Sequence, residues 1–175
     1  MVLEGREYWS DDARPQPATA RPGAERRRSL MPTILVGVDG SDPGWAALRF
    51  ALEEAELRRA TLRVICAWEL PVANWGEFPP PDETFDRFRR DAEEIVAAAA
   101  EIVAKEAPNV ECERLAPEGS PGTALLDNAG DASLIVVGTR GHGSVAGLLM
   151  GSVSQEVVHK AQCPVVVVPH EESAD

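Results

Sequence analysis

From residue 33 onward, short apolar and β-branched runs alternate with longer segments whose apolar residues recur every three or four positions. Short apolar runs are typical of strands covered on both faces, and the wider spacing is typical of helices with one buried face. This alternation predicts an α/β domain in which crossover helices join parallel strands. The predicted strands are residues 34–38, 62–67, 110–115, 134–137 and 164–169.

The segments between these strands carry helix signals. Ser41 or Asp42 can cap the first helix, and Pro43 suits an early helical position because its missing N–H has no partner there. The second helix must end before Pro108, since proline cannot continue a helix. The predicted helices begin at residues 41–42 and near residue 82, and cover residues 119–128 and 152–161. The apolar stripes of the two long helices are Trp45, Leu48, Leu52 and Ala55, then Phe85, Phe88, Ala92, Ile95, Ala99 and Ile102.

The third predicted strand is more polar than the others. It carries Glu111, Glu113 and Arg114 among its six residues. Charged side chains suit a strand that meets solvent along one side. We therefore expect this strand at an edge of the sheet.

Both ends of the chain fall outside the alternating pattern. Residues 1–30 carry three prolines, an arginine cluster at 26–28 and little apolar periodicity. Such a segment cannot bury enough apolar surface to offset the entropy lost on ordering. We expect residues 1–30 to be disordered, residues 31–170 to form one domain, and residues 171–175 to be a short tail.

The chain is strongly acidic, with 17 Lys and Arg against 29 Asp and Glu and a formal net charge of −12. The field of such a surface repels nucleic-acid phosphates and anionic lipid headgroups, which argues against generic binding to either. No run approaches the roughly 20 apolar residues that cross a bilayer, and the first residues lack the apolar core of a signal peptide. We therefore expect a cytoplasmic protein without nucleic-acid or membrane partners.

Two groups of potentially reactive residues favour structural roles. Cys66, Cys112 and Cys163 include no C-x-x-C pair for metal or redox chemistry, so we expect three small buried hydrophobes. The acidic residues at 53–56 and 93–94 lie on helices whose opposite stripe is apolar. This pattern is typical of a solvated face. No metal ligand is predicted in either group.

Glycines crowd the segment between the fourth strand and the last helix: Gly138, Gly141, Gly143, Gly147 and Gly151. Without a Cβ, glycine lets backbone N–H groups approach a ligand closely. The last of these glycines adjoins a helix start, where unpaired N–H groups and the helix dipole attract anions. The hydroxyls of Ser152 and Ser154 add donors, and Arg140 and His142 add a positive rim. The segment therefore predicts a site for a phosphate chain.

Familiar phosphate-binding motifs do not fit this segment. The P-loop pattern GxxxxGK[ST] is absent because no lysine precedes Ser144 or Ser152. The dinucleotide pattern GxGxxG fails because Gly141-x-Gly143 is followed by Gly147, one residue too far along. The chain also lacks the GxSxG elbow of serine hydrolases, so no hydrolytic triad is predicted.

Asp39 directly follows the first predicted strand. Open parallel sheets bind ligands beyond the carboxyl ends of their strands, where the strand order reverses. If the first and fourth strands are neighbours, Asp39 faces the same crevice as the glycine segment and lies near a ribose or a metal ion. Ala67, at the end of the second strand, then offers a wall for adenine. This arrangement gives each part of a nucleotide a place.

Three motifs carry a resemblance to a known family: Gly138-x2-Gly141-x9-Gly151-Ser152, Val38-Asp39, and Cys163-Pro164 followed by four valines. They resemble the universal stress protein family over residues 32–169. The resemblance implies an adenine-nucleotide alpha-hydrolase-like fold, an open five-stranded sheet of order 3-2-1-4-5 with helices on both faces. It also implies ATP with Mg²⁺ in the crevice and a homodimer joined through Val165 to Val168. Carried over by position, the cofactor contacts are Gly37, Val38, Asp39, Ala67, Val137, Gly138, Arg140, Gly141, His142, Gly143, Gly151, Ser152, Val153 and Ser154.

The resemblance implies an ATP-binding regulatory protein of the stress response, whose nucleotide occupancy alters a dimer or a partner surface. Fast phosphoryl transfer needs a cation on the γ-phosphate, metal ligands and an oriented nucleophile. Only Asp39, Arg140 and His142 are available for these tasks, so no catalytic residue is assigned. Two alternatives stay open: a slow ATPase that uses Asp39 and the glycine loop, and an interaction module with a vestigial nucleotide site.

Overall fold

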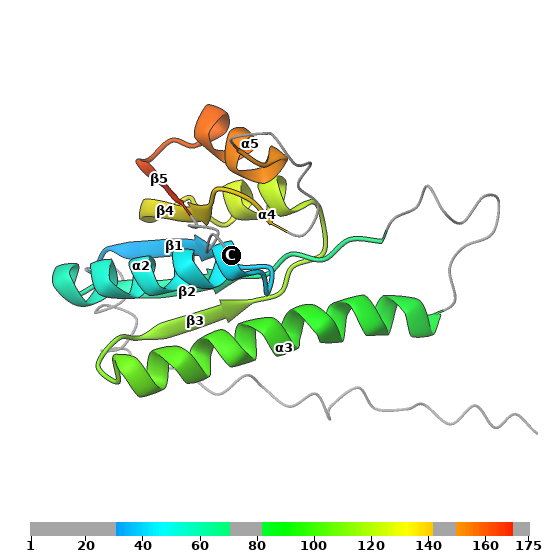
Figure 1. The fold of residues 1–175 in the computed structure, drawn as a ribbon, viewed down its shortest axis with the longest axis horizontal. Helices are drawn as coiled ribbons and strands as arrows, with labels where there is room; N and C mark the ends of the chain where they lie inside the picture. Colours follow the sequence, from blue (N-terminus) through cyan, green and yellow to red (C-terminus); the bar gives the residue numbers. More distant parts are fainter. Residues whose placement is uncertain (1–30, 71–81, 142–149, 170–175) are drawn as a thin grey trace, which may run out of the picture. The chain divides into compact units, whose positions relative to one another are not determined.

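The computed structural model describes residues 31–70, 82–141 and 150–169. Five strands form one sheet in the order β3-β2-β1-β4-β5 (Figure 1). All four pairings are parallel, and Val36 lies in register between Val64 and Val136. The strands are β1 Thr33–Gly37, β2 Thr61–Ile65, β3 Cys112–Leu115, β4 Ala132–Gly138 and β5 Val165–Val168. The predicted α/β class and strand order are confirmed.

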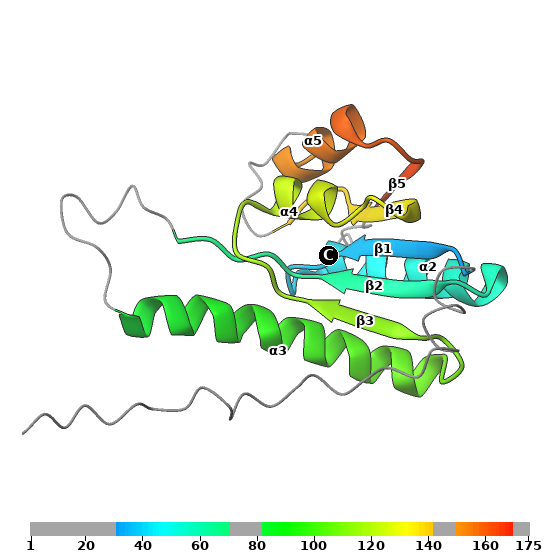
Figure 2. The ribbon, with the colours of Figure 1, turned by 180° about the vertical axis from the view of Figure 1, so that it is seen from behind.

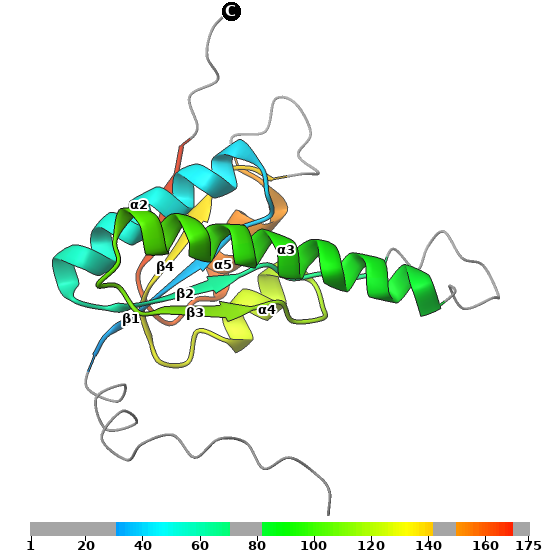
Figure 3. The same cartoon turned by 90° about the horizontal axis from the view of Figure 1, so that it is seen from below.

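Helices cover both faces of this sheet. They are α2 Asp42–Arg58, α3 Asp82–Glu106, α4 Pro121–Asp127 and α5 Ser152–Lys160. Figure 1 shows α2 in front of the sheet, and the reverse view in Figure 2 brings α4 forward. Seen from below, α2 and α3 lie on the same side (Figure 3). The apolar core is therefore split into an α2/α3 layer and a smaller α4/α5 layer.

The central strands are apolar because both of their faces are covered. Ile34 and Val36 belong to the α2/α3 layer, whereas Leu35 belongs to the α4/α5 layer. Successive strand residues point to opposite faces, so a strand between two layers needs an uninterrupted apolar run. All three side chains are 0% exposed. Strand β1 thus holds the loop that follows it on a rigid base.

The start of α2 confirms the predicted cap. Ser41 has an extended backbone, and its Oγ accepts a hydrogen bond from the Gly44 N–H at 3.3 Å. Pro43 lies in the first turn, where no intrahelical partner for an N–H is lost. The helix ends at Arg59, whose φ of 53° places it in the left-handed region.

The buried face of α3 differs from the predicted stripe. Ala92 and Ala99 are buried as expected, but Val96 and Val103 complete the buried row. Ile95 and Ile102 are only partly buried against the same layer. The apolar band of this alanine-rich helix is wider than one row of side chains, so spacing alone does not identify its centre.

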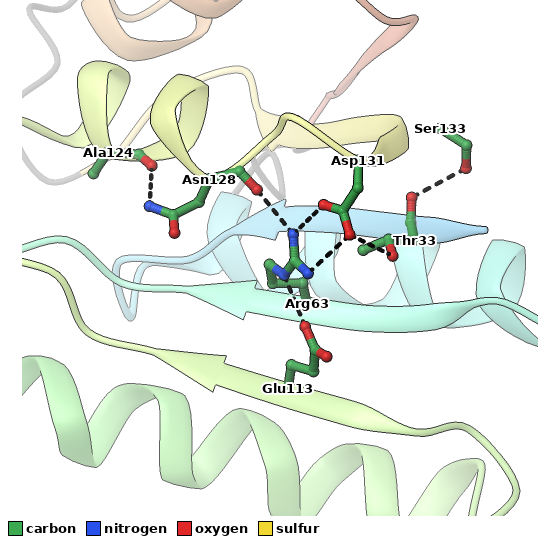
Figure 4. A network of polar contacts seen from close by, with 7 residues as sticks. All are labelled: Thr33, Arg63, Glu113, Ala124, Asn128, Asp131 and Ser133. Carbon is green, nitrogen blue, oxygen red and sulfur yellow. Dashed lines mark hydrogen bonds and ion pairs between the residues drawn. The ribbon is translucent and has the colours of Figure 1, made fainter. Parts of the chain in front are cut away.

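Strand β3 lies at an edge of the sheet, as its charged residues predicted. One of these charges, Glu113, has a partner inside the sheet. The Nε of Arg63, on β2, donates to Glu113 Oε2 at 2.8 Å (Figure 4). Both terminal nitrogens of Arg63 donate to the Asp131 carboxylate, and Nη1 also donates to the Asn128 carbonyl at 3.0 Å. The hydrogen bond from Arg63 holds the pKa of Asp131 below its usual range. The same bond raises the pKa of Arg63.

The three cysteines differ in exposure. Cys66 is 4% exposed, and its burial, reinforced by the negative charge of Asp39, raises the pKa of the thiol to about 11. Cys112 and Cys163 are only half-buried, which corrects the expectation of three buried thiols. They belong to β3 and to the turn before β5, and each of these edge strands has a neighbour on one side only among the described strands. Burial also raises the pKa of these two thiols.

Within the described part of the chain, no helix is long and apolar enough to span a membrane. Residues 1–30, 71–81, 142–149 and 170–175 lie outside that part. The predictions for residues 1–30 and 171–175, and the candidate contacts His142 and Gly143, therefore stay predictions.

Candidate functional site

A cavity of about 460 Å³ opens at the carboxyl ends of β1, β2 and β4. The strand order reverses between β1 and β4, because β2 and β3 are added on one side of β1 and β5 is added on the other side of β4. Open parallel sheets bind ligands at such a reversal. The volume lies in the range of about 300 to 1,000 Å³ that is usual for small-molecule sites. Its walls come from the strand ends and from the beginnings of α2, α4 and α5.

The structure brings together twelve of the fourteen predicted contacts around this cavity. They are Gly37, Val38, Asp39, Ala67, Val137, Gly138, Arg140, Gly141, Gly151, Ser152, Val153 and Ser154. The other two, His142 and Gly143, lie outside the described residues. Groups far apart in the sequence, such as Asp39 and Ser152, therefore line one crevice.

Sequence reasoning missed five lining residues: Gly44, Ile65, Glu69, Pro121 and Leu125. Ile65 and Leu125 are almost fully buried in the α4/α5 layer, so nothing in the sequence distinguishes them from ordinary core. Glu69 does carry a signal. It follows Ala67 by two positions, and an extended chain places such residues on the same side.

Asp39 is held between two loops. Its Oδ1 accepts hydrogen bonds from the Ser41 N–H at 3.0 Å and from the Ser41 hydroxyl. A Cβ at Gly44 would lie 2.7 Å from Oδ1, and a Cβ at Gly141 would overlap Oδ2. The Asp39 carboxylate therefore fits between these two residues only because both are glycines without a Cβ. Asp39 connects the loop after β1 with the loop after β4.

Helix α5 begins at the cavity without a capping side chain. Gly151 is the N-cap residue, with φ −75° and ψ 165°. The first N–H groups of any helix lack an intrahelical partner, and here they belong to Ser152, Val153 and Ser154, all of which line the cavity. The positive end of the helix dipole lies at the same place. This end of the cavity therefore favours an anion.

The hydroxyl of Ser154 is already used within the chain. Its one proton lies within hydrogen-bond distance of two carbonyl oxygens, that of Gly151 at 2.9 Å from Oγ and that of Thr139 at 3.2 Å, and the residue is 2% exposed. The Gly151 N–H also donates to the Thr139 carbonyl, at 2.7 Å. The Ser154 hydroxyl is thus engaged within the chain, and its expected role as a donor for phosphate stays a prediction. These bonds fasten the start of α5 to the end of β4, and Ser152, which is exposed, is the hydroxyl available to a ligand among the described lining residues.

The glycines of the site serve different purposes. A Cβ at Gly138 would lie 2.7 Å from the Pro43 carbonyl oxygen, so the packing of α2 on β4 requires this glycine. A Cβ at Gly151 would lie no closer than 3.5 Å to its nearest neighbour, and its backbone angles suit any residue. The fold does not require a glycine at 151. Space at that position remains available to a ligand.

The rest of the cavity is largely apolar. Val38, Ala67 and Val137 form walls beside the strand ends. Arg140 is the cationic side chain among the described lining residues, and Asp39 and Glu69 are the carboxylates. No cluster of three His, Cys, Asp or Glu side chains suited to a metal occurs in residues 31–70, 82–141 and 150–169. The described lining thus combines one cationic side chain in the loop after β4 with carboxylates that follow β1 and β2.

The chain is similar to proteins of one known family. The family model described as "Universal stress protein family" matches residues 31–169. A universal stress protein of Thermus aquaticus is 39% identical over 141 residues, which cover 79% of this chain and 99% of that protein. Universal stress protein Rv2623 of Mycobacterium tuberculosis is 34% identical over 145 residues, or 79% of this chain and 47% of that protein. The chain thus spans about half the length of the mycobacterial relative.

Two similar solved structures contain adenine nucleotides. A universal stress protein in complex with cAMP has a TM-score of 0.61 and 29% identity, over 81% of this chain and 98% of that one. The universal stress protein from Archaeoglobus fulgidus in complex with dAMP has a TM-score of 0.57 and 31% identity. The match covers 78% of this chain and 96% of that one. With its strand order and its family match, the chain belongs to the universal stress protein family and has that family's adenine-nucleotide alpha-hydrolase-like fold.

Proposed function

We propose that this chain binds ATP in the cavity at its strand ends and acts in the cytoplasm as a regulatory protein of the stress response. The start of α5 carries the proposal. Its first three residues, Ser152, Val153 and Ser154, line the cavity beside Gly151, a glycine that the fold itself does not require. Helix N-termini of this kind bind phosphate groups. The cAMP and dAMP complexes of similar proteins support an adenine nucleotide as the ligand class.

The proposed ligand spans the cavity from α5 to β2. The phosphates lie against the N–H groups of residues 152–154, with the Ser152 hydroxyl and Arg140 as further contacts. The ribose lies beside Asp39. The adenine ring packs on the apolar wall at Ala67, where burial of its faces is favourable. Of the two carboxylates in the lining, Glu69 follows Ala67 on the wall proposed for the base, and Asp39 lies beside Gly141 in the loop after β4.

The residues present fit a magnesium ion that arrives with ATP. Mg²⁺ keeps several of its waters and is commonly held by one or two carboxylates together with substrate phosphates. Asp39, a carboxylate that lines the cavity, would be its ligand from the protein. Bound there, the ion would neutralise phosphate charge.

Binding fits this site better than rapid hydrolysis does. Phosphoryl transfer is accelerated by several cations and an oriented nucleophile around the γ-phosphate. Among the described lining residues Arg140 is the one cation, and Asp39 is tied into its own loop. The chain therefore acts as a nucleotide-dependent regulator.

Strand β5 supplies the proposed homodimer surface. Within the described part of the chain it pairs only with β4, so its other edge is open to a second copy. Edge strands with apolar sequences readily pair with another chain. The strand is also connected to the nucleotide site, because the Thr139 N–H donates to the Val168 carbonyl at 3.0 Å. Nucleotide occupancy at the loop after β4 can thus alter the dimer.

A binding measurement tests the proposal. ATP at about 100 times its dissociation constant stabilises a native state that alone binds it by about 2.7 kcal/mol. We expect a matching rise in melting temperature and release of an adenine nucleotide when the purified protein is denatured. An unchanged melting curve with ATP, AMP and cAMP, and no released nucleotide, would contradict the proposal. Phosphate release at about one per second or faster, abolished by Asp39→Ala, would instead indicate an enzyme.

A further inference from the structure

Glu69 lies on the wall of the cavity that the proposed adenine ring uses. It lines the cavity together with Ala67, while the residue between them, Trp68, packs against the α2/α3 layer. Because side chains alternate along an extended chain, Ala67 and Glu69 point the same way. The carboxylate therefore stands beyond Ala67 on the same wall.

The residue before Glu69 is hydrogen-bonded to the segment that follows β3. The Trp68 N–H donates to the Pro117 carbonyl at 3.1 Å, and the Trp68 carbonyl accepts from the Gly119 N–H at 2.8 Å. The indole Nε1 donates to the Ala116 carbonyl at 3.1 Å. Two backbone bonds thus extend β2 beyond its last strand residue, and the indole bond fixes the Trp68 side chain between Ala67 and Glu69. The Glu69 side chain therefore starts from a fixed position at the edge of the cavity.

The two carboxylates of the cavity differ in their surroundings. Asp39 accepts two hydrogen bonds from Ser41. Glu69 is exposed, and no described side chain forms a hydrogen bond or an ion pair with it. A carboxylate accepts hydrogen bonds and repels other oxygen atoms. Glu69 thus offers the cavity an acceptor at the end away from the phosphate-binding end.

We propose that Glu69 is a specificity-determining residue, whose carboxylate accepts a hydrogen bond from the exocyclic amine of the bound base and so favours adenine over 6-oxo purines. This inference rests on the proposed nucleotide site. With the phosphates fixed at α5 and the ring on Ala67, the outer edge of the base faces Glu69. A 6-oxo base presents an oxygen there, which the carboxylate repels.

The test compares ATP with inosine triphosphate, whose base carries an oxygen in place of the amine. A hydrogen bond to a charged group is worth about tenfold or more in affinity, so the unaltered protein binds ATP at least about tenfold more tightly than inosine triphosphate. Glu69→Ala weakens ATP binding by a similar factor and leaves inosine triphosphate unchanged or tighter. Glu69→Gln keeps the shape of the side chain, and its amide can donate a hydrogen bond to the 6-oxo group of inosine triphosphate. This variant therefore also lowers the ratio of ATP affinity to inosine triphosphate affinity.

Glu118→Ala is the matched control. Glu118 is exposed and bridges Trp68 through the backbone, but it does not line the cavity. The Glu118→Ala substitution removes one negative charge close to Glu69. We expect it to leave the ratio of ATP affinity to inosine triphosphate affinity unchanged. Equal affinity of the unaltered protein for the two nucleotides, or an equal loss of both in Glu69→Ala, would overturn the role of Glu69 and leave the nucleotide site standing. Failure of the unaltered protein to bind either nucleotide would overturn the proposed function as well.

Discussion

Gly151 is a residue at which stability and nucleotide binding are expected to change in opposite directions. Serine caps a helix better than glycine and restricts the unfolded chain, so Gly151→Ser should raise stability by a few tenths to about 1 kcal/mol. Its hydroxyl accepts from the same N–H groups that are proposed to bind phosphate, so ATP affinity should fall by about tenfold or more. Urea unfolding and calorimetric titration measure the two effects.

Gly130→Ser is the control for this substitution. A Cβ at Gly130 meets nothing within 4 Å, and the residue does not line the cavity. The variant should therefore keep the ATP affinity of the unaltered protein. If Gly151→Ser folds and binds ATP with undiminished affinity, the phosphates do not lie at the start of α5.

The bond between Arg63 and Asp131 makes a pH-dependent contribution to stability. The pKa of Asp131 is lower in the folded chain than its unfolded value of about 3.9, so the contribution is complete above that value and is lost as the pH falls through the folded pKa. Asp131 has 63% of its side chain exposed, so solvent screening limits the effect. Asp131→Asn should cost about 0.5 to 1 kcal/mol at pH 7.

Urea unfolding at pH 7 and near pH 3 measures this difference. The cost of Asp131→Asn should shrink at the lower pH, which lies below the unfolded pKa of about 3.9, because there the unfolded chain takes up a proton at this carboxyl. Asp127→Asn changes an exposed carboxyl at the end of α4 and serves as the control. A cost for Asp131→Asn that is the same at both pH values would show that charge is not its cause.

At this scale, sequence reasoning works where a residue type has one role. Ser41 follows a strand and precedes Asp-Pro, and it is indeed the cap of α2. The sequence also predicts that the Ser154 hydroxyl contacts the ligand, and in the structure this hydroxyl is near the Gly151 carbonyl of its own helix start and the Thr139 carbonyl of the preceding loop. Only the tertiary structure brings Thr139 and Ser154 together. The partners of Arg63 were equally hidden, since they come from β3 and from the turn before β4.

The edge of β5 is the element that tests the proposed dimer. The Pro164 and Val168 carbonyls accept bonds from β4, so the alternate residues Val165 and Val167 point their backbone groups away from it. Proline is tolerated on an edge strand where the lost N–H faces outward. Val167→Pro should therefore keep the β4–β5 pairing and convert the dimer to a monomer, as measured by sedimentation equilibrium.

Val167→Ala is the control for the proline substitution, because it shortens the same side chain and retains the N–H. We expect this variant to stay a dimer. A Val167→Pro protein that folds and still sediments as a dimer would exclude the edge of β5 as the interface.

The elements themselves follow closely from the apolar pattern. Strands β1 and β4 were predicted from short runs that are apolar on both faces, and both are central. The long helix α3 shows the limit. Its position was predicted, but its buried row runs through Val96 and Val103 instead of Ile95 and Ile102. Which part of a wide apolar band meets the sheet depends on the tertiary packing of β2 and β3.

At the scale of the whole molecule, the strand order is what creates the cavity. Alternating strands and helices predict a parallel sheet, but they do not state which strands are neighbours. The order 3-2-1-4-5 came from the family resemblance, and the structure bears it out. Because β1 and β4 adjoin, Asp39 and Gly151 line one space despite their separation in the chain. The site is therefore a property of topology as much as of motif.

The central claim is that ATP binds with its phosphates at the start of α5 and its base at the end of β2. An NMR titration of the ¹⁵N-labelled protein with ATP tests it directly. We expect the backbone amide resonances of Ala67 and of residues 151–154 to shift with one common saturation curve, while those of α3, which contributes no residue to the cavity, stay in place. Shifts confined to residues outside the cavity, or no shifts at saturating ATP, would contradict the account.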